Sequence, residues 1–175
     1  GYPMRKLLSA GFAVALATAA TAQAADLNVK VEVPRLDVAE YHKPYVATWI
    51  EREDGSVATT LSVWYDIKMK DEEGQKWLKD MRQWWRKVGR EGKAPLDAVS
   101  GATRGPGVHA LNFSAGKAPL GKLAAGNYKL VVEAAREVGG REVVSIPFQW
   151  PAAKAQTLSA KGKTELGEVS LDLKP

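Results

Sequence analysis

The run YKLVVEA at residues 128–134, a glycine pair at 139–140 and the run REVVSIPFQW at 141–150 give the clearest structural signal in this chain. In both runs apolar side chains alternate with more polar ones, which is the period of a half-buried β-strand. The inward series are Tyr128, Leu130, Val132 and Ala134, then Val144, Ile146, Phe148 and Trp150. Because glycines between two such runs favour a turn, the sequence predicts an antiparallel hairpin.

Runs of the same kind lie upstream of this hairpin. Residues 27–33 alternate and end at Pro34, which predicts a strand. Residues 45–50 lead through Asp54-Gly55 into a returning run at 57–69. Asp-Gly between two β-rich runs is a strong hairpin signal, so a second hairpin is expected here.

Further strands are expected at 108–113 and at 164–173, with an approach to the central hairpin at 120–126 that ends in the turn residues Gly126-Asn127. Pro151 and the Ala/Lys-rich stretch after it predict a break. Several short strands separated by turn signals indicate an antiparallel, immunoglobulin-like β-sandwich.

The tryptophans of the upstream hairpin, Trp49 and Trp64, are expected to pack between the two sheets of that sandwich, since buried aromatic residues in sheets mostly serve the core.

Residues 71–88 change to a helical period. Acidic residues at 71–73 complement the dipole of a first turn, and Gly89 is well placed to end the helix. One face carries the apolar residues Trp77, Leu78, Met81, Trp84, Trp85 and Val88. The pattern predicts one inserted amphipathic helix whose tryptophan face is buried against the sheet. The alternative left open is that part of this face lies beside a cofactor, because the loop from 89 to 103 returns towards it.

The N-terminal segment has the pattern of an export signal. Gly1–Pro3 precede Met4 as a cloning remnant, and Arg5-Lys6 are followed by an apolar run at 7–22. Ala22-Gln23-Ala24 supplies a small-x-small cleavage site, so residues 1–24 are expected to be removed on export to the periplasm. The apolar run is short for a membrane helix.

A chain of 175 residues with 45% hydrophobic content suits a single domain, expected here at 25–175. Loss of the two cations and no acid in residues 1–24 lowers the net charge from +5 to +3. The charges alternate in sign along the chain, which makes nucleic acid a poor partner.

Cysteine is absent, which excludes a disulfide partner and thiolate-bound redox metals. Two histidines, His42 and His109, cannot form a structural zinc site by themselves, so no metal site is expected. Redox chemistry would have to rest on an organic cofactor.

One stretch is better explained by chemistry than by folding, namely DAVSGAT at 97–103. Small residues at Ser100, Gly101 and Ala102 leave the hydroxyl of Thr103 uncovered, and the glycine permits close approach of another molecule. The alternative is a small-residue loop between two elements. The stretch resembles the recognition motif for covalent flavin attachment: Asp, two variable residues, Ser or Thr, Gly or Ser, Ala, then Thr or Ser.

That resemblance implies the following roles. An FAD:protein FMN transferase, which uses Mg²⁺, splits FAD and joins the FMN phosphate to the final hydroxyl, here that of Thr103. Asp97 is then a recognition residue for the transferase or a neighbour of its metal-bound FAD. Ser100 would orient the loop by a hydroxyl-to-backbone hydrogen bond, and Arg104 would neutralise the phosphodiester.

The residues between Asp97 and the acceptor, Ser100, Gly101 and Ala102, complete the expected cofactor site. Trp84, Trp85 and His109 are further candidates for contact with the flavin, although a lone histidine on a strand is more often structural. No catalytic residue is expected, because the chain would be the substrate of the transferase.

The layout of the chain resembles the exported bacterial domain-of-unknown-function family 2271. The runs that carry the likeness are YVATWIE at 45–51, LSVWY at 61–65, SGAT at 100–103 and AGNY at 125–128. The resemblance implies a periplasmic β-sandwich that is found with FMN transferases and PepSY-type membrane redox proteins. The implied function is flavin-dependent electron transfer.

Two other function classes were weighed against an electron carrier. A non-redox periplasmic binding module would use loops and tryptophans of the sandwich and would need no cofactor. A hydrolase has little support, since the sequence has neither a Gly-x-Ser-x-Gly elbow nor a His-Glu-x-x-His motif.

Overall fold

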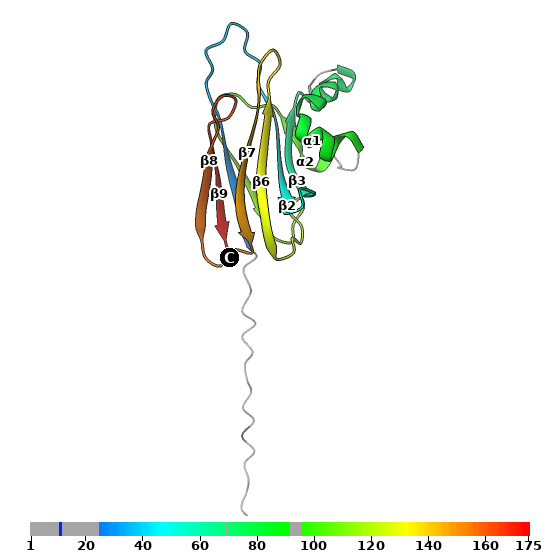
Figure 1. Ribbon diagram of the computed structural model, residues 1–175. Helices are drawn as coiled ribbons and strands as arrows, with labels where there is room; N and C mark the ends of the chain where they lie inside the picture. Colours follow the sequence, from blue (N-terminus) through cyan, green and yellow to red (C-terminus); the bar gives the residue numbers. More distant parts are fainter. Residues whose placement is uncertain (1–10, 12–24, 69, 92–95) are drawn as a thin grey trace, which may run out of the picture.

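The computed structural model describes residues 11, 25–68, 70–91 and 96–175. Two β-sheets stack face to face, and a short helical insert covers one side (Figure 1). The strands are β1 (Asp26–Val33), β2 (Tyr45–Arg52), β3 (Val57–Tyr65), β4 (Ser100–Ala102), β5 (Gly107–Ser114), β6 (Gly126–Ala135), β7 (Arg141–Trp150), β8 (Gln156–Lys161) and β9 (Glu168–Lys174). The insert contains the 3₁₀ segments η1 (Lys70–Asp80) and η2 (Gly89–Glu91) and the helices α1 (Arg82–Lys87) and α2 (Leu96–Val99).

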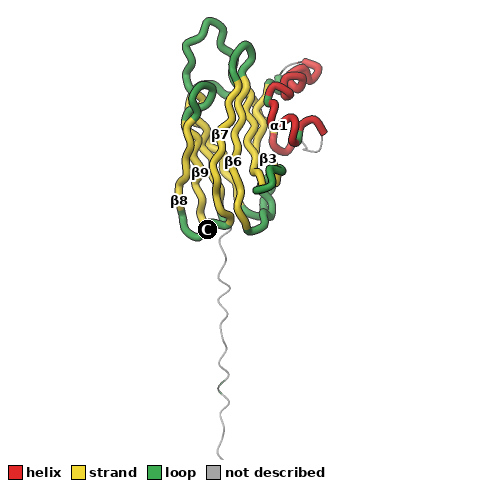
Figure 2. Tube along the Cα trace, in the orientation of Figure 1, coloured by secondary structure: helices red, strands yellow, loops and turns green. Residues whose placement is uncertain are grey.

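One sheet has the strand order β5-β1-β9-β8 and the other β4-β3-β2-β6-β7. All neighbouring strands are antiparallel except β3 and β4, which run parallel. The expected β-sandwich with a helical insert is confirmed, and Figure 2 shows the helices confined to one side of it. The expected central hairpin is β6–β7, in which Tyr128 pairs with Phe148 and Leu130 with Ile146.

The core between the sheets is built from the alternating residues that the sequence indicated. On β1, Leu27, Val29 and Val31 are fully buried, because every second side chain of the strand points inwards. Trp64 of β3 lies in this core, as expected. Trp49 does not, since it faces the opposite side of its sheet and packs under the insert. Both faces of β2 are covered, so alternation alone could not assign the face of this tryptophan.

The insert departs from the single helix expected at 71–88. The chain is 3₁₀-helical up to Asp80, bends at Met81, where ψ is 75°, and becomes α-helical only at Arg82. A 3₁₀ segment has three residues per turn instead of 3.6, so the expected stripe is not continuous. Met81 and Trp84 are buried as predicted, whereas Trp77 is 41% exposed.

Smaller corrections concern element ends. β3 stops at Tyr65 instead of continuing to Met69, which lies outside the described residues, and Ile67 is exposed. Gly126 and Asn127 open strand β6 instead of forming a turn before it. Strand β8 lies in the stretch predicted as a break.

None of the helices in the described part of the chain combines the length and apolar character that a membrane span requires. Apart from Gly11, residues 1–24 are outside that part, so the expected signal peptide is not described by the structure.

Candidate functional site

The stretch 97–103 is not the plain loop that the alternative predicted. Its first residues lie in α2, and Ser100–Ala102 form β4 at the edge of the five-stranded sheet. β4 pairs in parallel with Val63–Tyr65 of β3. Thr103 is the first residue after the strand and is partly exposed. The sheet edge therefore presents the threonine at a fixed point.

Gly101 is not required by the fold. A Cβ at this position would lie 3.7 Å from Cδ1 of Trp64, which is ordinary van der Waals contact. Its backbone is also outside the left-handed region that favours glycine. A glycine here is therefore explained better by the approach of another molecule than by packing within this chain.

Two side chains brace the loop that follows Thr103, and both do so through Trp64. The guanidinium carbon of Arg104 lies 4.5 Å from the centroid of the indole, in a cation–π contact. The ring of His109 meets the same indole edge-on, with 5.6 Å between centroids. His109 Nε2 also donates to the carbonyl of Gly105 at 2.7 Å, which requires the proton on that nitrogen. His109 is thus a positioning residue for the loop.

A pocket of about 370 Å³ opens beside the acceptor, and we call it the Thr103 pocket. One wall is Ala102 and Thr103. The other walls come from the segment before β2, from the start of β2 and from η1, and the residues that carry the arguments below are Tyr41, His42, Lys43, Tyr45, Trp77 and Asp80. Its volume lies in the range of small-molecule sites, and its lining combines aromatic with charged groups.

Several polar groups of the Thr103 pocket have defined partners. His42 lies between two carboxylates, with Nε2 3.0 Å from Glu40 Oε1 and Nδ1 3.5 Å from Glu137 Oε2. The hydroxyl of Tyr45 donates to the carbonyl of Gly74 at 3.2 Å, which ties β2 to η1. Burial raises the pKa of Tyr45 above its ordinary value.

The hydroxyl of Tyr41 is buried and has no hydrogen-bond partner among the described residues. Burial raises the pKa of this hydroxyl, and nearby Arg136 offsets only part of the effect. A neutral, unpaired donor at the wall of a pocket is unfavourable unless something fills the pocket and accepts its hydrogen bond.

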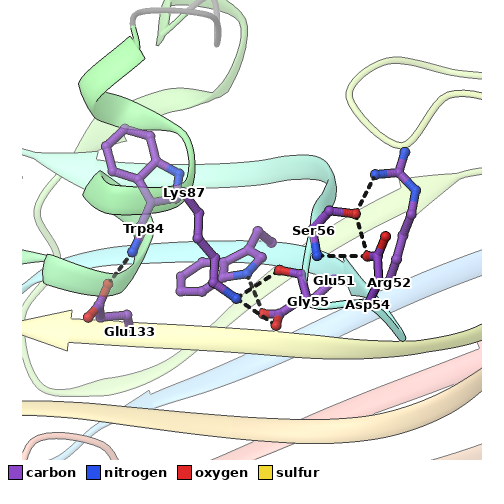
Figure 3. A network of polar contacts seen from close by, with 9 residues as sticks. Glu51, Arg52, Asp54, Gly55, Ser56, Trp84, Lys87 and Glu133 are labelled. Carbon is purple, nitrogen blue, oxygen red and sulfur yellow. Dashed lines mark hydrogen bonds and ion pairs between the residues drawn. The ribbon is translucent and has the colours of Figure 1, made fainter.

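A polar network fixes the insert on the sheet (Figure 3). Glu133 on β6 accepts hydrogen bonds from the backbone amides of Gln83 and Trp84, at 3.0 and 2.8 Å, and so caps the first turn of α1. Lys87 at the other end of the helix reaches Glu51 Oε1 at 2.7 Å and the carbonyl of Gly55 at 2.8 Å. These contacts hold the insert, and with it η1, against the five-stranded sheet.

The other expected site residues are placed as follows. Trp84 is buried, with Nε1 3.3 Å from Thr60 Oγ1, and Trp85 packs in the cluster beneath the insert. Neither lines the Thr103 pocket, which takes Trp77 instead. Asp97 lies in α2, and its side chain is outside the described part of the structure. The hydrogen bond expected from the hydroxyl of Ser100 is not formed with any residue whose side chain is described.

Sequence reasoning missed the pocket residues before β2. Tyr41 and Lys43 stand in a stretch that reads as polar and irregular, and no spacing pattern joins them to residue 103. Within the described residues, no group of three or more His, Asp or Glu side chains is arranged to hold a metal ion. The site therefore offers aromatic surface, hydrogen-bond donors and one accessible hydroxyl.

A second hollow, of about 600 Å³, follows the free part of β3 and is lined by Val57, Val88, Val99 and Pro119, among others. It is larger and more apolar, but Thr103 does not contribute to it. Only the Thr103 pocket places the candidate acceptor at its wall.

The comparisons with known proteins agree with this description. No curated protein and no solved structure matches the chain. The family model described as "Predicted periplasmic protein (DUF2271)" matches residues 26–168, which covers strands β1 to β8. The chain therefore belongs to this family and is a periplasmic protein.

Proposed function

We propose that this chain is a periplasmic electron-transfer protein that carries FMN as a phosphoester on Thr103. The observation that carries the proposal is the match of residues 97–103 to the flavin-attachment motif, together with the position of Thr103 at the end of an edge strand and at the wall of a pocket. The expected donor is FAD, delivered by an FAD:protein FMN transferase that uses Mg²⁺.

The residues present fit such a group. The hydroxyl of Thr103 has no hydrogen-bond partner among the described residues, so modification breaks no internal contact. Its neighbours Gly101 and Ala102 are small, and the loop after it is braced by Arg104 and His109. The unpaired hydroxyl of Tyr41 supports occupancy of the adjacent pocket.

The attachment step balances without an oxidant. The Oγ1 atom of Thr103 forms a bond to the phosphorus of the FMN half of FAD, the bond between the two phosphates breaks, AMP leaves, and the hydroxyl proton is released. Asp97 is proposed to be read by the transferase. Once attached, FMN would supply electron transfer, while the chain supplies position and electrostatics.

Covalent attachment has a physical advantage in the periplasm. A weakly held cofactor would be lost by dilution, whereas a tether keeps its effective concentration at the protein high. The proposed exchange partner is a PepSY-type membrane redox protein.

The test is co-expression in the periplasm with an FMN transferase, followed by intact and peptide mass spectrometry. We expect a gain equal to FMN less one water on the peptide containing residues 100–104. Thr103→Ala should lose the adduct, Thr103→Ser should retain part of it, and Asp97→Ala should reduce loading.

Thr103→Ala should change the free energy of unfolding by no more than about 0.5 kcal/mol, so that loss of the adduct is not loss of the fold. Absence of any adduct from the wild-type chain, or an undiminished adduct in Thr103→Ala, would contradict the assignment. A colourless wild-type protein would favour the non-redox binding module.

A further inference from the structure

We propose that the Thr103 pocket is the seat of the flavin ring, with Trp77 contacting the face of the ring, Tyr41 donating to a ring carbonyl and Lys43 facing the phosphodiester. The inference rests on the proposed function and adds the residues that hold the cofactor after attachment. It replaces the expectation that Trp84 and Trp85 perform this role.

The first argument is the exposure of Trp77. Large apolar side chains at the surface of the described residues are few, and Trp77 is the only aromatic among them, at 41% exposed. The indole stands at the wall of a pocket that also contains Tyr41 and Tyr45. Flat aromatic side chains around a pocket provide stacking surface for a planar ring system.

The second argument is that Trp77 is exposed but firmly supported. Its neighbours Leu78 and Met81 are buried beneath the insert. The η1 backbone is held by the Tyr45 hydroxyl, and Gly74 packs so closely on the carbonyl of Asp66 that no Cβ would fit. An aromatic side chain on a fixed backbone loses little entropy when it stacks on a ligand, which is typical of a preorganised site.

The third argument is the arrangement of polar groups. Tyr41 supplies a buried hydroxyl without a partner in the described structure. A Cβ on Gly105 would lie 3.9 Å from Cε of Lys43, so this lysine reaches over the loop that follows Thr103. An ammonium group there is close to the position of a phosphodiester on Thr103, and the opposite charges attract.

The carboxylates of the pocket fix the orientation. Asp66, Asp80 and Glu137 also line it, with His42 bonded to Glu137. They would repel a phosphate, so the phosphate belongs on the Lys43 side and the uncharged ring on the side of Trp77 and Tyr41. The short ribityl chain of FMN joins the two positions.

The chain allows a test that does not depend on the transferase. It contains no cysteine, so Thr103→Cys creates a unique thiol that can be coupled to a thiol-reactive flavin. Flavin emission is then measured in this conjugate and, separately, in the transferase-modified wild-type chain. Stacking on an indole quenches flavin emission, so we expect both samples to emit several-fold less than free FMN.

Trp77→Ala should restore emission several-fold, and Trp77→Phe should restore less, because it keeps an aromatic face in the pocket. Val88→Ala, at the wall of the second hollow, is the matched control and should leave emission unchanged. Emission equal to that of free FMN, emission insensitive to Trp77→Ala, or recovery in Val88→Ala instead would overturn the inference. Failure of the proposed function shows separately, as absence of the adduct from the mass spectrum of the wild-type chain.

Discussion

The backbone amide of Trp84 donates a hydrogen bond of 2.8 Å to Oε1 of Glu133, a fully buried carboxylate on the neighbouring sheet. The second oxygen of Glu133 accepts from Gln83 at 3.0 Å and from Arg141 at 2.7 Å. One side chain on β6 therefore determines where helix α1 begins, because it satisfies amides that a helix start leaves unpaired.

Replacing Glu133 should destabilise the protein strongly. Glu133→Ala leaves two backbone amides and a guanidinium without their acceptor, and we expect a loss of about 3 kcal/mol in the free energy of unfolding. Glu133→Gln should cost less, since it keeps one acceptor oxygen. Urea denaturation measures both, with the exposed Glu168→Gln as control, expected within about 0.5 kcal/mol. Equal midpoints for Glu133→Ala and wild type would show that the cap is not needed.

The two exposed and buried tryptophans of the insert should respond differently to truncation. Trp84 is 1% exposed, so Trp84→Ala should cost about 3–5 kcal/mol through loss of core packing. Trp77→Ala should change stability by about 0.5 kcal/mol or less, because the indole faces the Thr103 pocket. Thermal or chemical unfolding distinguishes them. A large loss of stability in Trp77→Ala would place this side chain in the core instead.

Two glycines near the site provide a matched pair. A Cβ at Gly89 would lie 2.6 Å from Cζ3 of Trp84 and 2.7 Å from Cε3 of Trp85, so Gly89→Ala should cost about 1–3 kcal/mol through overpacking. At Gly101 the nearest contact is 3.7 Å, and Gly101→Ala should lie within about 0.5 kcal/mol of wild type. Denaturation midpoints test the contrast, which would fail if both variants behaved alike.

Glu142 should make stability depend on pH in acid. Burial raises its pKa, but hydrogen bonds from the backbone amides of residues 163–166 outweigh this and hold the pKa below the ordinary value of 4.5. The stabilisation is therefore present above about pH 4.5 and is lost as the pH falls through the folded-state pKa.

The difference in unfolding free energy between wild type and Glu142→Gln should accordingly be largest near neutral pH and should shrink below pH 4.5. Denaturation at a series of pH values measures it. A difference that grows towards acid would reverse the sign and contradict the assignment.

The sequence predicted the sandwich well because most strands bury one face, so that apolar residues alternate. It did not predict β8, since Gln156–Lys161 lies at a sheet edge and lacks a regular apolar series. The bend at Met81 was equally hidden, because Glu133, which caps the following helix, lies some fifty residues further along the chain.

For the candidate site, the sequence predicted the acceptor but not its surroundings. The stretch 97–103 is contiguous and can be read as a motif. The Thr103 pocket joins it to Tyr41, Lys43 and Trp77, from two segments that no local pattern connects with it. The period of an ideal α-helix placed Trp77 in the core, whereas the observed 3₁₀ turn leaves it at the pocket.

The contacts of Trp64 give the attachment loop a second significance. The same indole is part of the inter-sheet core, carries Arg104 on its face and meets His109 at its edge. The loop is consequently assembled only when the two sheets have closed around this ring. Flavin loading at Thr103 should therefore report on maturation: misfolded chains would remain colourless, and the yellow fraction of a preparation would measure how much of it had reached the native state.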